Sequence, residues 1–239
     1  MDTPLLKSCQ LALLLVCLLL LGACATKHTP AQPDTTEKTG SVIQPDFPRL
    51  IAEVEKDHGP VAANRIRYWA KLIQENEHQL DLQKLQQTNQ FFNSARFVTD
   101  QEVWLRDDYW ATPVEFLIKD AGDCEDFAIA KYVTLDLMGF DTDKMRITYV
   151  KALTLDQPHM VLAYYTTPTG EPVILDNLNP QILPAGQRQD LIPVYSFNGT
   201  TLWLARSRNE QVPSGDAQQL GLWQQLIERM QRELPPVPP

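Results

Sequence analysis

The stretch "AGDCEDFAIA", residues 121–130, places one cysteine among three carboxylates at the start of an apolar run. Cys124 is flanked by Asp123, Glu125 and Asp126. The thiolate is the reactive form of cysteine, and neighbouring negative charges disfavour it. Either Cys124 is therefore inert, or a positive charge offsets the carboxylates.

The same stretch carries the signals of a helix N-terminus. Asp123 suits the N-cap position, Asp126 falls at N3, and the apolar body runs on to Gly139, a residue type that commonly follows a helix end. Cys124 is then the first helical residue. Backbone N–H groups and the helix dipole favour an anion there and can donate to an oxyanion. The position suits a nucleophile; a cap-region cysteine without a role is the alternative.

Composition sets the class of protein. The chain has 239 residues, 44% hydrophobic and 21% charged, which is typical of a soluble globular protein with one domain or two small ones. A net charge of −9 argues against a nucleic-acid partner, because neutralising phosphates needs a basic surface. A cationic partner or a metal ion fits this charge better.

The N-terminus has the pattern of a bacterial lipoprotein signal. Lys7 precedes the apolar run "LALLLVCLLLLGA", which is too short to span a membrane but suits a signal peptide. Residues 21–24, Leu-Gly-Ala-Cys, resemble a lipobox, so we expect a signal peptide over residues 1–23 and a lipid on Cys24. Ala25 favours delivery to the outer membrane, facing the periplasm. An ordinary secretory signal or an uncleaved anchor is the alternative.

A tether and one folded domain are expected after the signal. Residues 24–48 are rich in Pro, Thr and charge and predict a flexible tether, and residues 49–239 predict the domain. Cys9 and Cys17 leave with the signal, so Cys124 is the one cysteine expected inside the domain. A free thiol in an oxidising compartment needs burial or a use.

Helical patterns come first in the domain and strand patterns follow. Gly59-Pro60 predicts the opening of one helix, and Thr112, Pro113 and Glu115 form a capping box at the start of another. A further docking helix is expected between Leu220 and Leu234. Helices are also expected over residues 81–93 and 124–138, and strands over 145–153, 159–167, 172–178, 192–197 and 201–207. This order predicts an α+β domain with an antiparallel sheet.

A base and its orienting acid can be sought among the strands. Of the four histidines, His159 begins the strand pattern "HMVLAYY", and Asp176 lies in the next one. If these strands pair about the T-P-T-G turn, His159 comes opposite Asp176 and their side chains share a face. Cys124, His159 and Asp176 would then supply a nucleophile, its base and the orienter of the base. A structural histidine on the strand is the alternative.

The blocks "GDCEDFAIAKY", "HMVLAYY", "LDNL" and "PVYSFN" together resemble the bacterial transglutaminase-like cysteine proteinases, over roughly Arg65 to Arg206. The resemblance implies a papain-like or transglutaminase-like fold, with the nucleophile at a helix N-terminus packed on an antiparallel sheet. It also implies calcium dependence, with Asp123, Glu125 and Asp126 as metal ligands. Calcium prefers oxygen ligands, and further acids, such as Asp107, Asp108 or Asp120, could complete the set.

The family resemblance extends to biological role. It implies a periplasmic endopeptidase that cleaves the N-terminal region of a large repeat adhesin. An inner-membrane receptor for cyclic di-GMP would act as its inhibitor, so that biofilm release follows a fall in the nucleotide. A lipid anchor departs from the usual soluble form and would limit travel to such a receptor. Two alternatives stay open: a transglutaminase-type acyl transferase, and a non-catalytic calcium-binding envelope lipoprotein.

Overall fold

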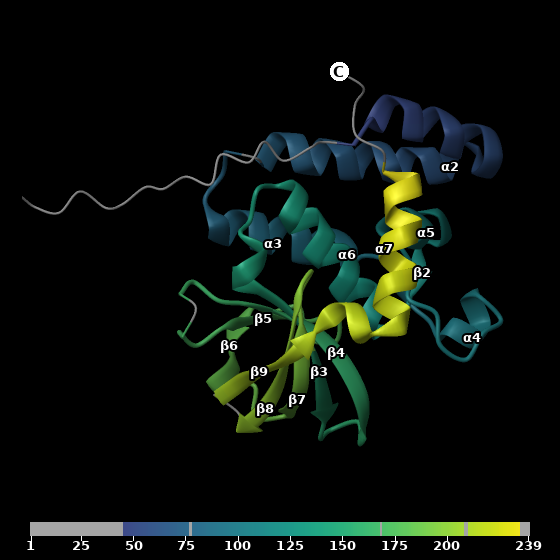
Figure 1. Ribbon diagram of the computed structural model, residues 1–239. Helices are drawn as coiled ribbons and strands as arrows, with labels where there is room; N and C mark the ends of the chain where they lie inside the picture. The colour runs from purple at the N-terminus through teal and green to yellow at the C-terminus, as the bar shows by residue number, and fades with distance from the viewer. Residues whose placement is uncertain (1–44, 77, 168, 208–209, 235–239) are drawn as a thin grey trace, which may run out of the picture. The chain divides into compact units, whose positions relative to one another are not determined.

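An antiparallel sheet of seven strands and a group of helices make up the fold in the computed structural model (Figure 1). The structure describes residues 45–76, 78–167, 169–207 and 210–234, which belong to one compact unit. The strands run in the order β6-β5-β4-β3-β7-β8-β9. They are β3 (Met145–Ala152), β4 (Gln157–Tyr164), β5 (Val173–Leu175), β6 (Leu183–Pro184), β7 (Leu191–Phe197), β8 (Thr201–Ser207) and β9 (Glu210–Asp216).

Helices precede the sheet in the chain, and one follows it. They are α2 (Phe47–Asn76), α3 (Asp81–Phe92), α4 (Asp100–Val103), α5 (Pro113–Lys119), α6 (Cys124–Leu137) and α7 (Gly221–Glu233). Two short strands, β1 (Arg96–Phe97) and β2 (Ala121–Gly122), pair in parallel. Short 3-10 turns are η1 (Thr142–Lys144), η2 (Ala185–Gln187) and η3 (Ala217–Gln219). The predicted α+β class with an antiparallel sheet is confirmed.

The first helix is longer than the sequence signal predicts. Gly59 has φ +84°, outside the helical range, and it kinks α2 in the middle. The segment before this kink is helical from Phe47 onward, because Leu50 and Val54 bury their side chains in the core. Gly59-Pro60 therefore marks a bend between two helical segments.

Helix α6 is the central element of the core. Ile129, Ala130 and Leu135 have no exposed surface, and the helix packs against β4 and β3. On its far side it is fixed to α2, where the indole N–H of Trp69 donates to the hydroxyl of Thr134 at 2.8 Å. A helix that is apolar all round is one that protein surrounds. The N-terminus of α6, which carries Cys124, is held rigidly in this setting.

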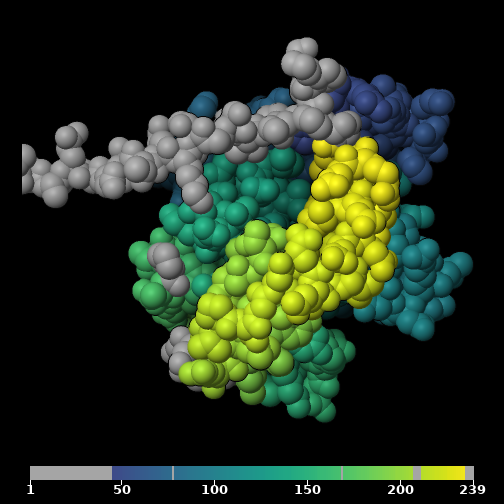
Figure 2. Space-filling view, viewed as in Figure 1, coloured from purple at the N-terminus to yellow at the C-terminus, as the bar shows by residue number. Residues whose placement is uncertain are grey.

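Helix α7 returns from the sheet to the start of α5. The predicted capping box is present there: Glu115 N–H donates to Thr112 Oγ1 at 3.1 Å, and Thr112 N–H donates to the Glu115 carboxylate at 2.8 Å. The Thr112 hydroxyl also donates to Glu233, and Arg229 donates to the Trp110 carbonyl. Figure 2 shows α7, in yellow, on the surface of the molecule. The last helix thus secures the segment that leads to Cys124.

Several predictions concern parts of the chain outside the described residues. The signal peptide over residues 1–23, lipidation of Cys24 and most of the tether over residues 24–48 fall there, as does the end of the chain after residue 234. Among the described residues, none of the helices combines the length and the apolar character that crossing a membrane requires.

Candidate active site

Cys124 is the first residue of α6, directly after the extended N-cap Asp123. Gly122 makes this entry possible, because a Cβ there would lie 2.5 Å from Asp126 Oδ2 and 2.9 Å from the Phe116 ring. Glycine at this position therefore lets the chain approach the start of its own helix closely. The sulfur of Cys124 is partly buried and lies 3.1 Å from Glu125 Oε2, to which the thiol donates.

Three effects act on the thiol of Cys124. Burial raises the pKa of Cys124, and the negative charges of Glu125 and Asp123 raise it further. A hydrogen bond from the backbone N–H of Met160 to the sulfur acts in the opposite direction. With the carboxylates alone around it, the cysteine is held as a thiol, as the sequence "GDCED" suggests.

The contact with Met160 depends on how the sheet ends. Strand β5 pairs with β4 only from Leu162 to Tyr164, so the earlier part of β4 has no strand neighbour on that side. The backbone N–H of Met160 lies in this part of β4 and acts to lower the pKa of the Cys124 thiol. Since α6 packs against β4, Cys124 lies near the part of the strand that carries His159.

His159 and Asp176 form a buried pair. His159 Nε2 and Asp176 Oδ1 are 2.8 Å apart, and the two residues are 2% and 1% exposed. Because a carboxylate oxygen accepts at this distance, Nε2 carries the ring proton and Nδ1 is the ring nitrogen left to accept one. The structure thus brings together the histidine and the acid that the sequence singles out.

The predicted register between their strands is wrong by two residues. Leu162 lies opposite Leu175, so the position opposite His159 is beyond Asp176. A shift of two residues keeps each side chain on the same face of a sheet, since the side-chain period is two. Asp176 lies just past the end of β5 and reaches His159 diagonally across this face.

Asp176 is held as a carboxylate by further donors. Its Oδ1 also accepts from Leu178 N–H at 2.9 Å, and its Oδ2 accepts from Arg188 Nη2 at 2.7 Å. Burial alone would raise the pKa of Asp176, but the hydrogen bonds from His159, Leu178 and Arg188 lower it to about 2. Asp176 is therefore an ionised carboxylate at neutral pH.

An acidic cluster lies beside Cys124. Carboxylate oxygens of Asp100, Asp123 and Glu125 lie within 4.8 Å of one another. Burial raises the pKa of Asp100 to about 6, and burial together with the charge of Glu125 raises the pKa of Asp123 to about 8. Oδ1 of Asp100 and Oδ1 of Asp123 are buried and have no hydrogen-bond partner within the described parts of the chain. Buried oxygen atoms without donors suit a hard cation such as calcium.

Asp126 has a different position from the other two carboxylates of the motif. It is fully buried, and its oxygens accept from Ala111 N–H at 2.7 Å and from Asp123 N–H at 3.4 Å. It lies outside the cluster of three that could hold an ion. Its backbone contacts fix the loop before α6. Of the further acids considered, Asp120 lies 3.9 Å from Arg65, and Asp107 and Asp108 are exposed.

Two residues of the site have no local signal in the sequence. Asp100 begins α4, and its Oδ2 accepts from Tyr109 N–H at 2.5 Å, which turns Oδ1 toward the cluster. Arg188 follows η2 and reaches Asp176. Both meet the motif only through tertiary folding.

The chain is similar to known proteins in sequence and in fold. The family of bacterial transglutaminase-like cysteine proteinases (BTLCP) matches residues 67–201. A solved structure of Legionella pneumophila LapG is 42% identical, with a TM-score of 0.68, and the match covers 77% of this chain and 97% of LapG.

Two further LapG structures from the same organism also match. The EGTA-treated form is 43% identical, with a TM-score of 0.69 and coverage of 77% of this chain and 97% of that one. The calcium-bound form is 42% identical, with a TM-score of 0.67 and coverage of 76% and 98%. Curated protein sequences gave no match. The family match over more than half of the chain, together with these identities, establishes that the chain belongs to the bacterial transglutaminase-like cysteine proteinase family.

Proposed function

We propose that the protein is a calcium-dependent cysteine endopeptidase in which Cys124 is the nucleophile, His159 the general base and Asp176 the group that orients His159. The observation that carries this proposal is the 2.8 Å hydrogen bond between His159 and Asp176, made from the strand against which the helix of Cys124 packs. A nucleophile, a base and an orienting acid are what acyl transfer requires.

The reaction follows from these groups. His159 Nδ1 takes the thiol proton, and the sulfur of Cys124 attacks the peptide carbonyl carbon. The carbonyl oxygen becomes an oxyanion, which the backbone N–H of Cys124 stabilises at the start of α6. His159 then gives its proton to the leaving amine, and a thioester remains. A water molecule, deprotonated by His159, attacks the thioester and releases the acid product and the thiol.

The carboxylate oxygens of the acidic cluster suit calcium. Asp100, Asp123 and Glu125 would hold the ion, because their oxygens converge and two of them lack donors. The calcium-bound form of the related LapG supports this choice of metal. When bound, calcium would supply positive charge that offsets the carboxylates around Cys124. Asp126 would support the site through its contacts with Ala111 and Asp123.

The substrate and setting belong to the same proposal. We infer that the enzyme cleaves the N-terminal region of a large repeat adhesin in the periplasm, and that an inner-membrane receptor for cyclic di-GMP restrains it. The family membership supports a cysteine protease, and the lipobox pattern ending at Cys24 is the reason to propose a lipid anchor in the outer membrane. Such an anchor would keep the enzyme close to an adhesin retained at that membrane.

Cleavage of an adhesin fragment tests the proposal. Purified protein should cut the N-terminal fragment of an adhesin encoded by the same organism, and Cys124→Ala or EGTA should each abolish cleavage. Adding calcium back should restore cleavage by the wild-type protein and leave Cys124→Ala inactive. Incorporation of a labelled amine into a glutamine peptide without any peptide hydrolysis would contradict the protease. Cleavage that EGTA does not change would contradict the metal requirement.

A further inference from the structure

Arg188 contacts the catalytic acid on the side away from the histidine. Its Nη2 donates to Asp176 Oδ2 at 2.7 Å, while Asp176 Oδ1 faces His159 Nε2 at 2.8 Å. Arg188 is 4% exposed, so this ion pair is shielded from solvent. Charge-assisted hydrogen bonds of this kind are among the strongest in proteins. Both oxygens of the Asp176 carboxylate are thus hydrogen bonded.

The guanidinium is itself fixed by a second acid. Arg188 Nε donates to Asp190 Oδ1 at 3.0 Å, and Nη2 donates to Asp190 Oδ2 at 2.8 Å. This two-point contact sets the plane of the guanidinium and so the direction from which it meets Asp176. A lysine could supply the charge here but not the planar fork.

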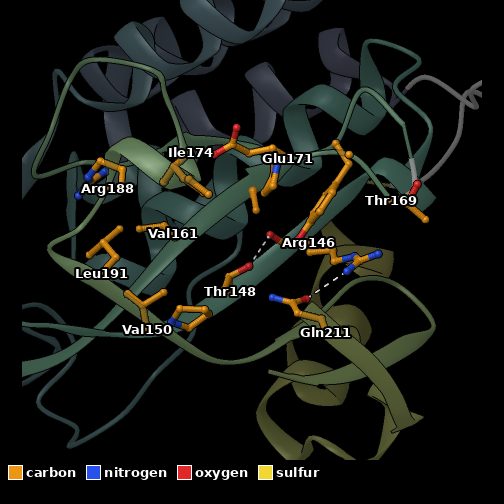
Figure 3. Close-up of a pocket in the computed structure, with 16 residues that line it drawn as sticks. Arg146, Thr148, Val150, Val161, Thr169, Glu171, Ile174, Arg188, Leu191 and Gln211 are labelled. Carbon is orange, nitrogen blue, oxygen red and sulfur yellow. Dashed lines mark hydrogen bonds between the residues drawn. The ribbon is translucent and has the colours of Figure 1, made fainter. Parts of the chain in front are cut away.

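The same guanidinium forms part of the wall of a cavity of about 470 Å³ on the sheet face. Figure 3 shows Arg188 at one end of this cavity, and Arg146 and Gln211 at the other. Arg146 donates to Gln211 at 3.1 Å and stacks on Tyr165. Both arginines therefore line one cavity, while the contact with Asp176 is made by Arg188. Shortening Arg188 would open the cavity toward Asp176.

We propose that Arg188 is a positioning residue, which orients Asp176 and thereby His159 for proton transfer; this role rests on the proposed function. The charged groups that act on Asp176 are His159, Arg188, Asp190 and, from α6, the buried Lys131. Of the two cations, Arg188 makes the direct hydrogen bond. Without it, the carboxylate loses the donor that fixes Oδ2, and His159 loses its fixed ring orientation.

Chemical rescue tests the assignment. Arg188→Ala should lower kcat on the adhesin fragment by about 10- to 100-fold, as expected for loss of a charged hydrogen bond, with KM within about twofold. Ethylguanidine, which replaces the atoms removed, should restore activity, and ethylammonium should restore less. Arg146→Ala removes the same atoms from the other end of the cavity, and added ethylguanidine should leave its activity unchanged. Rescue of both variants, or of neither, would overturn the assignment.

The pH profile and the histidine signal give two further readouts. The ratio of Arg188→Ala to wild-type kcat/KM should fall as the pH is lowered from 7 to 4, because Asp176 is protonated more easily without Arg188. Arg188→Lys, which keeps the charge, should show less of this fall and serves if the alanine variant does not fold. A ratio independent of pH in both variants would indicate a purely structural role.

The ring N–H signal of His159 in NMR separates this inference from the proposed function. The chain has four histidines, so the His159 resonance can be assigned with His159→Gln. Loss of Arg188 should shift the Nε2–H proton resonance of His159, because Asp176, the acceptor of that proton, then loses the donor that fixes its orientation. If the wild-type protein showed no proteolysis, the proposed function would be refuted, but the His159 signal could still be measured. An unchanged Nε2–H resonance of His159 in Arg188→Ala would refute the positioning role.

Discussion

His159 and Asp176 are hydrogen bonded at 2.8 Å although neither lies opposite the other in the sheet. The acid follows the last residue of β5, where the chain leaves the strand and the side chain reaches along the sheet face. Leu178 N–H and Arg188 hold the carboxylate in that direction. The pair therefore depends on contacts outside the strand ladder as well as on the ladder itself.

Replacing the acid tests the orienting role of Asp176. Asp176→Asn keeps the size of the side chain but removes the charge, and its amide group would face either His159 or Arg188, which are both donors. We expect kcat to fall by about 10²- to 10⁴-fold, the range associated with general acid–base catalysis. Steady-state kinetics on the adhesin fragment measures this. A loss below threefold, with the fold intact by circular dichroism, would contradict the role.

Calcium should increase the reactivity of Cys124. Positive charge in the cluster of Asp100, Asp123 and Glu125 offsets the carboxylates that hold the cysteine as a thiol. Alkylation by iodoacetamide at neutral pH should quicken about tenfold for each unit by which the pKa of Cys124 falls. Mass spectrometry of the labelled peptide follows the rate with calcium and with EGTA.

The matched controls for this labelling are two isosteric variants. Asp100→Asn should weaken the response to calcium, because it removes one charge from the cluster. Asp57→Asn changes an exposed carboxylate in α2 and should leave the response unchanged. An equal response in all three proteins would place the ion elsewhere.

Without calcium, the free energy of unfolding should fall as the pH rises, and calcium should reduce this fall. The folded pKa values of Asp100, about 6, and Asp123, about 8, lie above the ordinary value, so the folded state binds more protons than the unfolded state from about pH 4 upward. The free energy of unfolding in EGTA should therefore fall from pH 5 to pH 7. Calcium should flatten this fall, because it binds the ionised carboxylates.

Two other groups, Asp176 and Lys131, limit the pH range of that experiment, because each makes the folded state more stable as the pH rises. The pKa of Asp176, about 2, stabilises the fold above pH 4, and this contribution is lost as the pH falls toward 2. Burial lowers the pKa of Lys131 to about 7, and this favours the folded state as the pH rises above 7. Urea unfolding at pH 5, 6 and 7 avoids the effect of Asp176 and, at pH 7, meets only the start of the effect of Lys131. Stability that rises with pH in EGTA would contradict the assignment of the cluster.

The contact between α2 and α6 gives a prediction for stability alone. Thr134→Val keeps the shape of the side chain but leaves the buried indole N–H of Trp69 without its acceptor. We expect a loss of about 1–3 kcal/mol in the free energy of unfolding, with kcat unchanged. Thr154→Val, at an exposed turn, should stay within about 0.5 kcal/mol of the wild type. A loss in kcat without a loss in stability would contradict this reading of Thr134.

Local signals predict the helix that carries Cys124 well. The start of α6 at Cys124 and the capping box at Thr112 both follow from residues three or four positions apart, and the structure confirms them. Strand β9 was missed, because its sequence, with Pro213 and Gly215, lacks the alternation of a strand. It forms through pairing with β8.

The parts of the site that depend on long-range contact could not be read from the sequence. Asp100 meets Asp123 through the turn that ends at Tyr109, and Arg188 meets Asp176 across a loop. No periodic pattern links such residues. The register of β4 and β5 was wrong for a related reason, since the length of the paired region is set by packing as well as by the turn.

The position of α7 has a consequence for how the enzyme matures. Arg229 and Glu233 contact Trp110 and Thr112, more than a hundred residues earlier in the chain. Contacts of such sequence separation form late, because loop-closure entropy opposes them. A nascent chain that lacks α7 has Cys124, His159 and Asp176. It does not have the contacts that fix the segment before Cys124. Completion of synthesis thus becomes a condition for a fully ordered active site.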